Sequence, residues 1–177
     1  MNTNVRITQE SLLRKLAEQR KLSHAYIFSG NDHVHKEQLV HALLEILAVQ
    51  PPDQIHLSPE GEGSTTEITI AQIRALSTFF SMSAWNSPYK AAVIADAHSM
   101  NQEAQSAFLK LLEEPKGDTI FFLLSEYPDM LLATIRSRVQ EFKFFAFAPP
   151  KISTSDIAEF EKLQKADLVM RFTHAKK

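Results

Sequence analysis

The stretches "KAAVIAD" (90–96) and "TIFFLL" (119–124) flank "NQEAQSAFLKLLEEP" (101–115), and this order decides the fold. The two outer stretches are apolar without the alternation of a half-exposed strand, so they predict strands that are buried on both faces. The middle stretch repeats apolar residues at helical spacing, with Asn101 as N-cap and Pro115 at its end. Strands of this kind alternating with helices predict a parallel sheet covered on both sides.

The rest of the chain continues this alternation. We expect further helices at 8–22, 36–49 and 68–82, and further strands at 25–29, 54–58 and 140–147. Thr8 is the expected N-cap of the first helix, whose Leu12 and Leu13 share an inward face. Pro128 is expected at the first position of a helix after strand 119–124. Residues 1–148 therefore predict one α/β domain, and the polar, helical pattern of 149–177 predicts the beginning of a second, helical domain.

The composition of the chain excludes several classes of function. The chain has 177 residues, a formal net charge of −2 and no cysteine, which excludes disulfides, thiol catalysis and cysteine-bound zinc. The chain lacks the overall positive charge that would indicate nucleic-acid binding. No apolar run approaches the roughly 20 residues that span a bilayer, and the N-terminus lacks an apolar signal core. We therefore expect a cytoplasmic protein.

The segment "SGNDHVHKEQ" (29–38) follows a predicted strand, where nucleotide-binding proteins carry a phosphate loop of the form G-x-x-x-x-G-K-[ST]. Gly30 and Lys36 fit this pattern. His35 stands at the second glycine and Glu37 at the hydroxyl that binds magnesium, so a carboxylate would face the phosphates. The residues alone favour an ordinary strand-to-helix turn over a working ATP site.

The partner of a phosphate loop is an acidic residue at the end of a neighbouring strand, followed by a glutamate that activates water. Asp96 holds the first position, but Ala97 follows it. Asp96 is therefore a magnesium ligand of a weakened site or a cap at the end of its strand. The histidines at 33, 35 and 41 lack the spacing of metal ligands, and we predict no metal site.

The stretch 95–140, "ADAHSMNQEAQSAFLKLLEEPKGDTIFFLLSEYPDMLLATIRSRVQ", resembles the AAA+ subunits of bacterial DNA polymerase III clamp loaders, above all the delta-prime type. The shared residues include Asp96-Ala97, Leu112-Glu113-Glu114-Pro115, Thr134-Ile135 and Ser137-Arg138. The chain departs from the family at Ser106, Phe108 and Val139, and it lacks the family's four-cysteine zinc module.

The resemblance implies an AAA+ core (1–148) with a parallel sheet flanked by helices, the start of a helical lid (149–177), and no C-terminal collar. It implies a stator subunit that does not hydrolyse ATP but supports the loading of sliding clamps in DNA replication. Its Arg138, in a turn shaped by Ser137, would be an arginine finger on ATP bound by a neighbour, with Arg136 a secondary candidate. Ser125 falls at a sensor position, where we expect a structural hydrogen bond.

The same resemblance implies no cofactor of the chain's own, since the neighbour binds the ATP and the zinc module is absent. The implied partners are the gamma/tau and delta subunits of a bacterial clamp loader, and through them the sliding clamp and primed DNA. One alternative is a motor subunit that hydrolyses ATP through an altered loop, for which Lys36 and Asp96 would have to suffice. A second alternative, a DNA-binding regulator, is disfavoured by the net charge.

Overall fold

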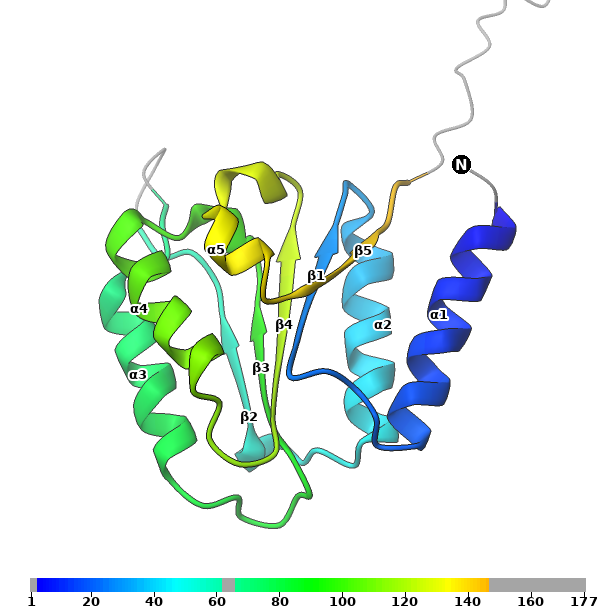
Figure 1. Cartoon of the computed structure of the whole chain (residues 1–177), viewed down its shortest axis with the longest axis horizontal. Helices are drawn as coiled ribbons and strands as arrows, with labels where there is room; N and C mark the ends of the chain where they lie inside the picture. The colour runs from blue at the N-terminus through cyan, green and yellow to red at the C-terminus, as the bar shows by residue number, and fades with distance from the viewer. Residues whose placement is uncertain (1–2, 62–65, 147–177) are drawn as a thin grey trace, which may run out of the picture. The chain divides into compact units, whose positions relative to one another are not determined.

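Five parallel strands form one sheet in the computed structural model, which describes residues 3–61 and 66–146 (Figure 1). Their spatial order is β2-β3-β4-β1-β5. The strands are β1 (Ala25–Ser29), β2 (Gln54–Leu57), β3 (Lys90–Ile94), β4 (Thr119–Ser125) and β5 (Gln140–Lys143). Because every pair is parallel, the carboxyl ends of all strands lie at one edge of the sheet.

Helices cover both faces of the sheet (Figure 1). The longer ones are α1 (Thr3–Glu18) and α2 (His33–Ile46) on one side, and α3 (Ile70–Ser81) and α4 (Gln102–Glu113) on the other. Single turns connect the remaining elements: η1 (Pro51–Asp53), η2 (Ala97–Ser99), η3 (Pro128–Met130) and α5 (Ala133–Arg136). None of the helices in the described ranges is long and apolar enough to cross a membrane.

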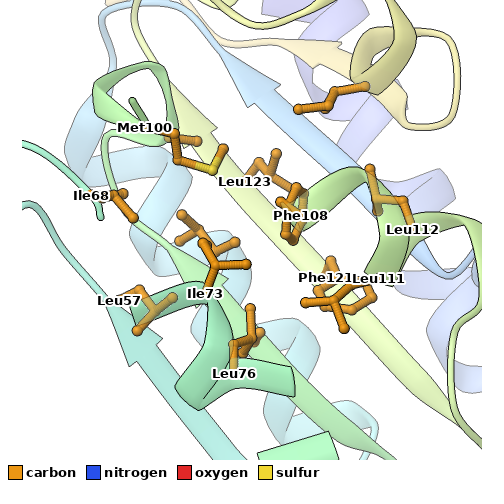
Figure 2. Close-up of a cluster of buried hydrophobic side chains, with 14 of the residues drawn as sticks. Leu57, Ile68, Ile73, Leu76, Met100, Phe108, Leu111, Leu112, Phe121 and Leu123 are labelled. Atoms are coloured by element: carbon orange, nitrogen blue, oxygen red, sulfur yellow. The ribbon is translucent and has the colours of Figure 1, made fainter. Parts of the chain in front are cut away.

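The two-sided burial explains why the strands lack alternation in sequence. In β1, Ala25 and Ile27 join the cluster under α3 and α4, whereas Tyr26 and Phe28 join the cluster under α1 and α2. Figure 2 shows the first cluster, in which Phe108 of α4 meets Phe121 of β4 edge to face, with ring centroids 5.4 Å apart. Burying a side chain of this size stabilises the fold by about 1.5–3 kcal/mol. The parallel, doubly covered sheet predicted from the sequence is confirmed.

Two helix starts differ from the sequence prediction. Helix α2 begins at His33 rather than at residue 36, because the Asp32 side chain caps it by accepting a hydrogen bond from the His35 amide at 3.3 Å. Helix α1 begins at Thr3, so Thr8 lies within the helix and is not its N-cap. Leu12 is 48% exposed and does not share the inward face of Leu13.

Other expectations agree with the structure more closely. Asn101 caps α4 through a hydrogen bond from the Ala104 amide to its Oδ1 at 2.9 Å. Pro128 opens a helical turn, although the single helix expected after it is two short turns, η3 and α5. The final strand is shorter than predicted, since β5 ends at Lys143. The predicted helical domain at 149–177 lies outside the described residues.

Candidate functional site

The loop between β1 and α2 has only three residues: Gly30, Asn31 and Asp32. Gly30 has φ 108°, a conformation that favours glycine, and its amide donates to the Ser125 carbonyl at 3.0 Å. The segment that leaves β5 crosses this loop. The Asp32 amide donates to the Phe144 carbonyl at 3.3 Å, and the Ala146 amide donates to Asn31 Oδ1 at 2.9 Å.

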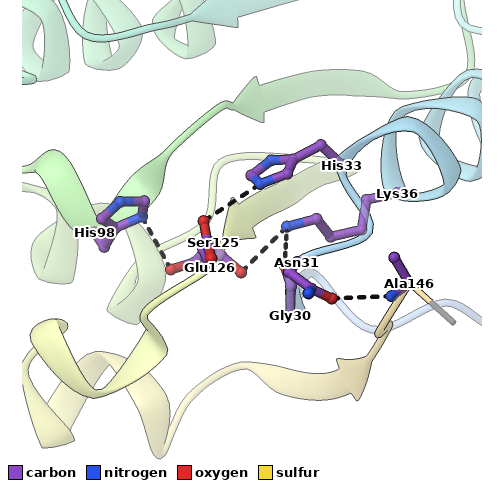
Figure 3. A network of polar contacts seen from close by, with 8 residues as sticks. All are labelled: Gly30, Asn31, His33, Lys36, His98, Ser125, Glu126 and Ala146. Carbon is purple, nitrogen blue, oxygen red and sulfur yellow. Dashed lines mark hydrogen bonds and ion pairs between the residues drawn. The ribbon is translucent and has the colours of Figure 1, made fainter. Parts of the chain in front are cut away.

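Lys36 turns back into the protein (Figure 3). Its Nζ donates to the carbonyl of Gly30 at 2.6 Å and to the carbonyl of Ser125 at 3.2 Å, and the residue is only 1% exposed. Burial lowers the pKa of the Lys36 ammonium below its usual value, against the opposing charges of nearby carboxylates, chiefly Asp96 and Glu126. The lysine thus ties the loop to the end of β4.

His35 and Glu37, the two departures from the phosphate-loop pattern, have different surroundings. The His35 ring packs against Phe144 with centroids 5.6 Å apart, and its Nε2 lies 3.5 Å from Glu10 Oε2 of α1. A glycine here would remove this contact between α1, α2 and the β5 exit segment. Glu37 is exposed, and its negative charge is among those that raise the pKa of Lys36.

Polar side chains gather at the same edge of the sheet, where Ser125 makes a structural hydrogen bond of the kind expected, whereas the contacts of His33, His98 and Glu126 were not predicted from the sequence. Ser125 Oγ lies 3.3 Å from His98 Nδ1, and His33 Nε2 lies 3.4 Å from Glu126 Oε2 (Figure 3). Burial lowers the pKa of the His98 imidazole, partly opposed by Asp96 and Glu126. The available signal was that His33, His98 and Glu126 follow the ends of β1, β3 and β4, because parallel strands bring their carboxyl ends to one edge.

Asp96 occupies the turn after β3 in the left-handed conformation, with φ 45°. It is the N-cap residue of η2, but its side chain makes no capping hydrogen bond with that turn. Its charge instead raises the pKa of Lys36 and His98. Ala97, which follows Asp96 where a hydrolytic site would need a glutamate that activates water, is fully buried.

Arg138 lies apart from this cluster, just after α5. Its Nη2 is 3.0 Å from Glu113 Oε1 at the end of α4, and its Nη1 donates to the Thr134 carbonyl at 3.0 Å and to Ser137 Oγ at 3.4 Å. Arg136 instead pairs with Asp129, with Nη1 and Oδ1 2.6 Å apart. The partners of Arg138 and those of Lys36 share no residue, so the structure does not join the two groups of predicted site residues.

Within residues 3–61 and 66–146, no three His, Asp or Glu side chains gather so that they could hold a metal ion. At the carboxyl edge, polar groups of the chain form hydrogen bonds with one another. The chemistry available at Arg138 is a fixed positive charge that is 38% exposed.

Comparison with known proteins gives a consistent result. Residues 44–148 match the family described as DNA polymerase III, delta subunit. DNA polymerase III subunit delta' of Pseudomonas aeruginosa is 31% identical over 151 residues, which cover 73% of this chain and 45% of that protein. The subunit delta' of Bacillus subtilis is 31% identical over 183 residues, which cover 92% of this chain and 54% of that protein. The chain thus spans about half the length of these curated relatives.

Solved structures share the fold. A DNA polymerase III gamma subunit-related protein of Thermotoga maritima superposes with a TM-score of 0.64 at 28% identity, over 81% of this chain and 47% of that one. The DNA clamp loader delta protein of Bacillus subtilis superposes with a TM-score of 0.59 at 10% identity, over 77% of this chain and 42% of that one. The sheet and its flanking helices therefore have the AAA+ architecture.

Proposed function

The chain belongs to the DNA polymerase III delta subunit family, and on this premise we propose that it serves as a clamp-loader stator that does not hydrolyse ATP. In this role it supports the loading of sliding clamps during DNA replication in the bacterial cytoplasm. It assembles with gamma/tau and delta subunits, and reaches the clamp and primed DNA through them. It supplies Arg138 to the ATP site of a neighbouring gamma/tau subunit.

The observation that carries the non-hydrolysing role is the direction of Lys36. In a phosphate loop the lysine reaches the phosphates and the backbone amides of the loop surround them. Here the ammonium is bonded to the Gly30 and Ser125 carbonyls, and the Asp32 carboxylate occupies the N-terminus of α2. An anion would have to displace both Asp32 and these carbonyls. The residues present do not fit a nucleotide's phosphates.

The magnesium half of the site also supports this proposal. Hydrolysis requires a group that positions or activates water. The residue after Asp96 is the buried Ala97, which has no group to take a proton. The hydroxyl expected to bind magnesium is replaced by the exposed carboxylate of Glu37.

Arg138 has the properties that a finger acting in trans requires. Negative charge grows on the phosphoryl oxygens in the transition state, and a guanidinium supplied from outside stabilises it. The Arg138 guanidinium is fixed by Thr134 and Ser137 on its own turn and remains 38% exposed. Because the neighbour's site is complete only after docking, hydrolysis becomes coupled to assembly.

Calorimetric titration of Mg-ATP tests the first part of the proposal. We expect no saturable heat from the native chain. We also expect none from His35→Gly/Glu37→Thr, because these changes restore the pattern without lengthening the three-residue loop or removing Asp32. Saturable binding by the native chain that Lys36→Ala abolishes would overturn the proposal and favour the motor-subunit alternative.

ATP turnover by the assembled loader tests the second part. Replacing Arg138 by alanine should slow turnover at the adjoining site by about 10³–10⁵-fold, the usual contribution of such a finger. Arg136→Ala is the matched control, since Arg136 lies two residues away and is similarly exposed. Equal effects of the two substitutions, or none from Arg138→Ala, would contradict the assignment of the finger.

A further inference from the structure

The carboxylate that faces Arg138 belongs to a different element of the fold. Glu113 is the last residue of α4, and its Oε1 lies 3.0 Å from Arg138 Nη2. The other hydrogen bonds of the guanidinium, to Thr134 and Ser137, come from residues within four positions of Arg138. Glu113 is thus the only partner among these that could release the guanidinium without disturbing the turn that carries it.

The position of Glu113 is unfavourable without a cation beside it. The C-terminus of a helix carries partial negative charge from its unpaired carbonyls, so an acidic side chain in the last turn is destabilising. The Arg138 guanidinium compensates the Glu113 carboxylate, and together with Lys110 in the last turn it compensates this end of α4. The two side chains are 45% and 38% exposed, so water weakens the pair and it can be exchanged.

Arg136 provides an internal comparison. It pairs with Asp129, whose side chain is 88% exposed, and both residues lie in the same short segment of the chain. The Arg136–Asp129 pair therefore connects neighbouring turns, whereas the Arg138–Glu113 pair connects the Arg138 turn to the end of α4. Only the second pair links the proposed finger to the rest of the core.

We propose that Glu113 is a positioning residue that holds the Arg138 guanidinium while the neighbour's ATP site is empty and releases it to the γ-phosphate. This inference rests on the proposed function of Arg138. A phosphate carries more negative charge than one carboxylate and accepts two parallel N–H bonds from a guanidinium. Arg138 Nη2 cannot keep its bond to Glu113 while that edge of the guanidinium is turned to a phosphate.

Breaking the pair is a fixed cost of engaging ATP, and it is the same for bound ATP and for the transition state. A uniform cost of this kind raises KM and leaves kcat unchanged. Removing the charge of Glu113 should therefore lower the KM for ATP at the adjoining site. The pair is exposed, so the decrease should be about two- to fivefold, the range of exposed ion pairs.

The test compares four loaders assembled with the complete protein: native, Glu113→Gln, Arg138→Ala and Glu113→Gln/Arg138→Ala. Asp129→Asn, which frees Arg136, is the matched control. We expect Glu113→Gln to lower KM two- to fivefold at constant kcat, as estimated above. Asp129→Asn should change neither constant, and Glu113→Gln should have no effect once Arg138 is absent.

Each other outcome has a defined meaning. An unchanged KM in Glu113→Gln, with turnover lost in Arg138→Ala, would refute the role of Glu113 and leave the finger intact. A fall in kcat would show that Glu113 supports the active geometry and is not displaced, which also overturns the inference. Normal turnover in Arg138→Ala would remove the proposed function and this inference together. Thermal unfolding of each variant separates these results from loss of folding.

Discussion

Gly30→Ala should destabilise the protein more than Gly117→Ala, the same addition of one methyl group at another loop glycine. Gly30 has φ 108°, and a Cβ at this position would lie 2.1 Å from the Phe144 carbonyl oxygen and 2.8 Å from its carbon. These are backbone atoms and cannot rotate away. The Phe144 carbonyl would have to retreat by about 1 Å to reach van der Waals contact, which would disturb its hydrogen bond from the Asp32 amide.

Three costs combine at this position. Left-handed backbone strain in a residue with a side chain costs about 1–2 kcal/mol, overpacking about 1–3 kcal/mol, and each lost hydrogen bond about 0.5–1.5 kcal/mol. Because such costs overlap, we expect a decrease of about 3–5 kcal/mol in the free energy of unfolding. Domains are stable by only about 5–15 kcal/mol, so the variant should remain folded but with a clearly lowered urea midpoint.

Gly117→Ala is the matched control. Gly117 also has a positive φ, 63°, but a Cβ there would meet nothing within 4 Å. Its cost should be the backbone strain alone, about 1–2 kcal/mol. Urea unfolding followed by circular dichroism measures the stability loss in both variants. Circular dichroism is preferred to tryptophan fluorescence because the single tryptophan, Trp85, is 84% exposed and a poor reporter of unfolding. Equal losses in the two variants would refute the close packing of the β5 exit segment on the loop.

Two further predictions concern buried charges. Burial raises the pKa of Asp53, but hydrogen bonds from the backbone amides of Trp85, Asn86 and Ser87 outweigh it and lower the pKa to about 2. Because the folded pKa lies below the ordinary value of 3.8, the stability that Asp53 contributes is complete above that value and is lost as the pH falls toward about 2. The difference in unfolding free energy between native protein and Asp53→Asn should therefore shrink on acidification, and a constant difference from pH 5 to 2 would contradict this. Lys36→Ala should lower the free energy of unfolding by about 2–4 kcal/mol even without any ligand, because it leaves a cavity and an unpaired Gly30 carbonyl. If urea unfolding shows a decrease below about 1 kcal/mol, the lysine does not have this structural role.

The sequence was sufficient to predict the parallel sheet and the succession of strands and helices along the chain. Strands β3 and β4 were recognisable because both of their faces are buried, which removes the alternation of polar residues. The predicted start of α2 at residue 36 lies three residues after the observed start at His33, because a local capping signal sets the first turn. That signal was Asp32, a favoured N-cap residue, which the structure shows in this role.

The missed parts of the site depend on contacts between distant segments. The phosphate-loop pattern that contains Lys36 does not reveal that the Nζ of this lysine reaches the Ser125 carbonyl, 89 residues away. No local sequence pattern indicates that the Asp53 carboxylate accepts a hydrogen bond from the Trp85 amide, 32 residues later. Arg138 could be singled out from its motif, but its partner Glu113 could not, because the pairing follows from the approach of α5 to α4.

The separation of the two groups of side chains makes the proposed loss of phosphate binding independent of the proposed role of Arg138. At the carboxyl edge of the sheet, Lys36 is bonded to carbonyls, His33 to Glu126 and Ser125 to His98. These contacts join polar groups of the chain to one another, and the buried Lys36 ammonium is held by neutral carbonyl oxygens. Arg138 draws its partners from α4 and its own turn, and none of them from this edge. We therefore expect substitutions at Lys36 to leave the geometry of Arg138 unchanged, so that the two proposed properties can be tested independently of each other.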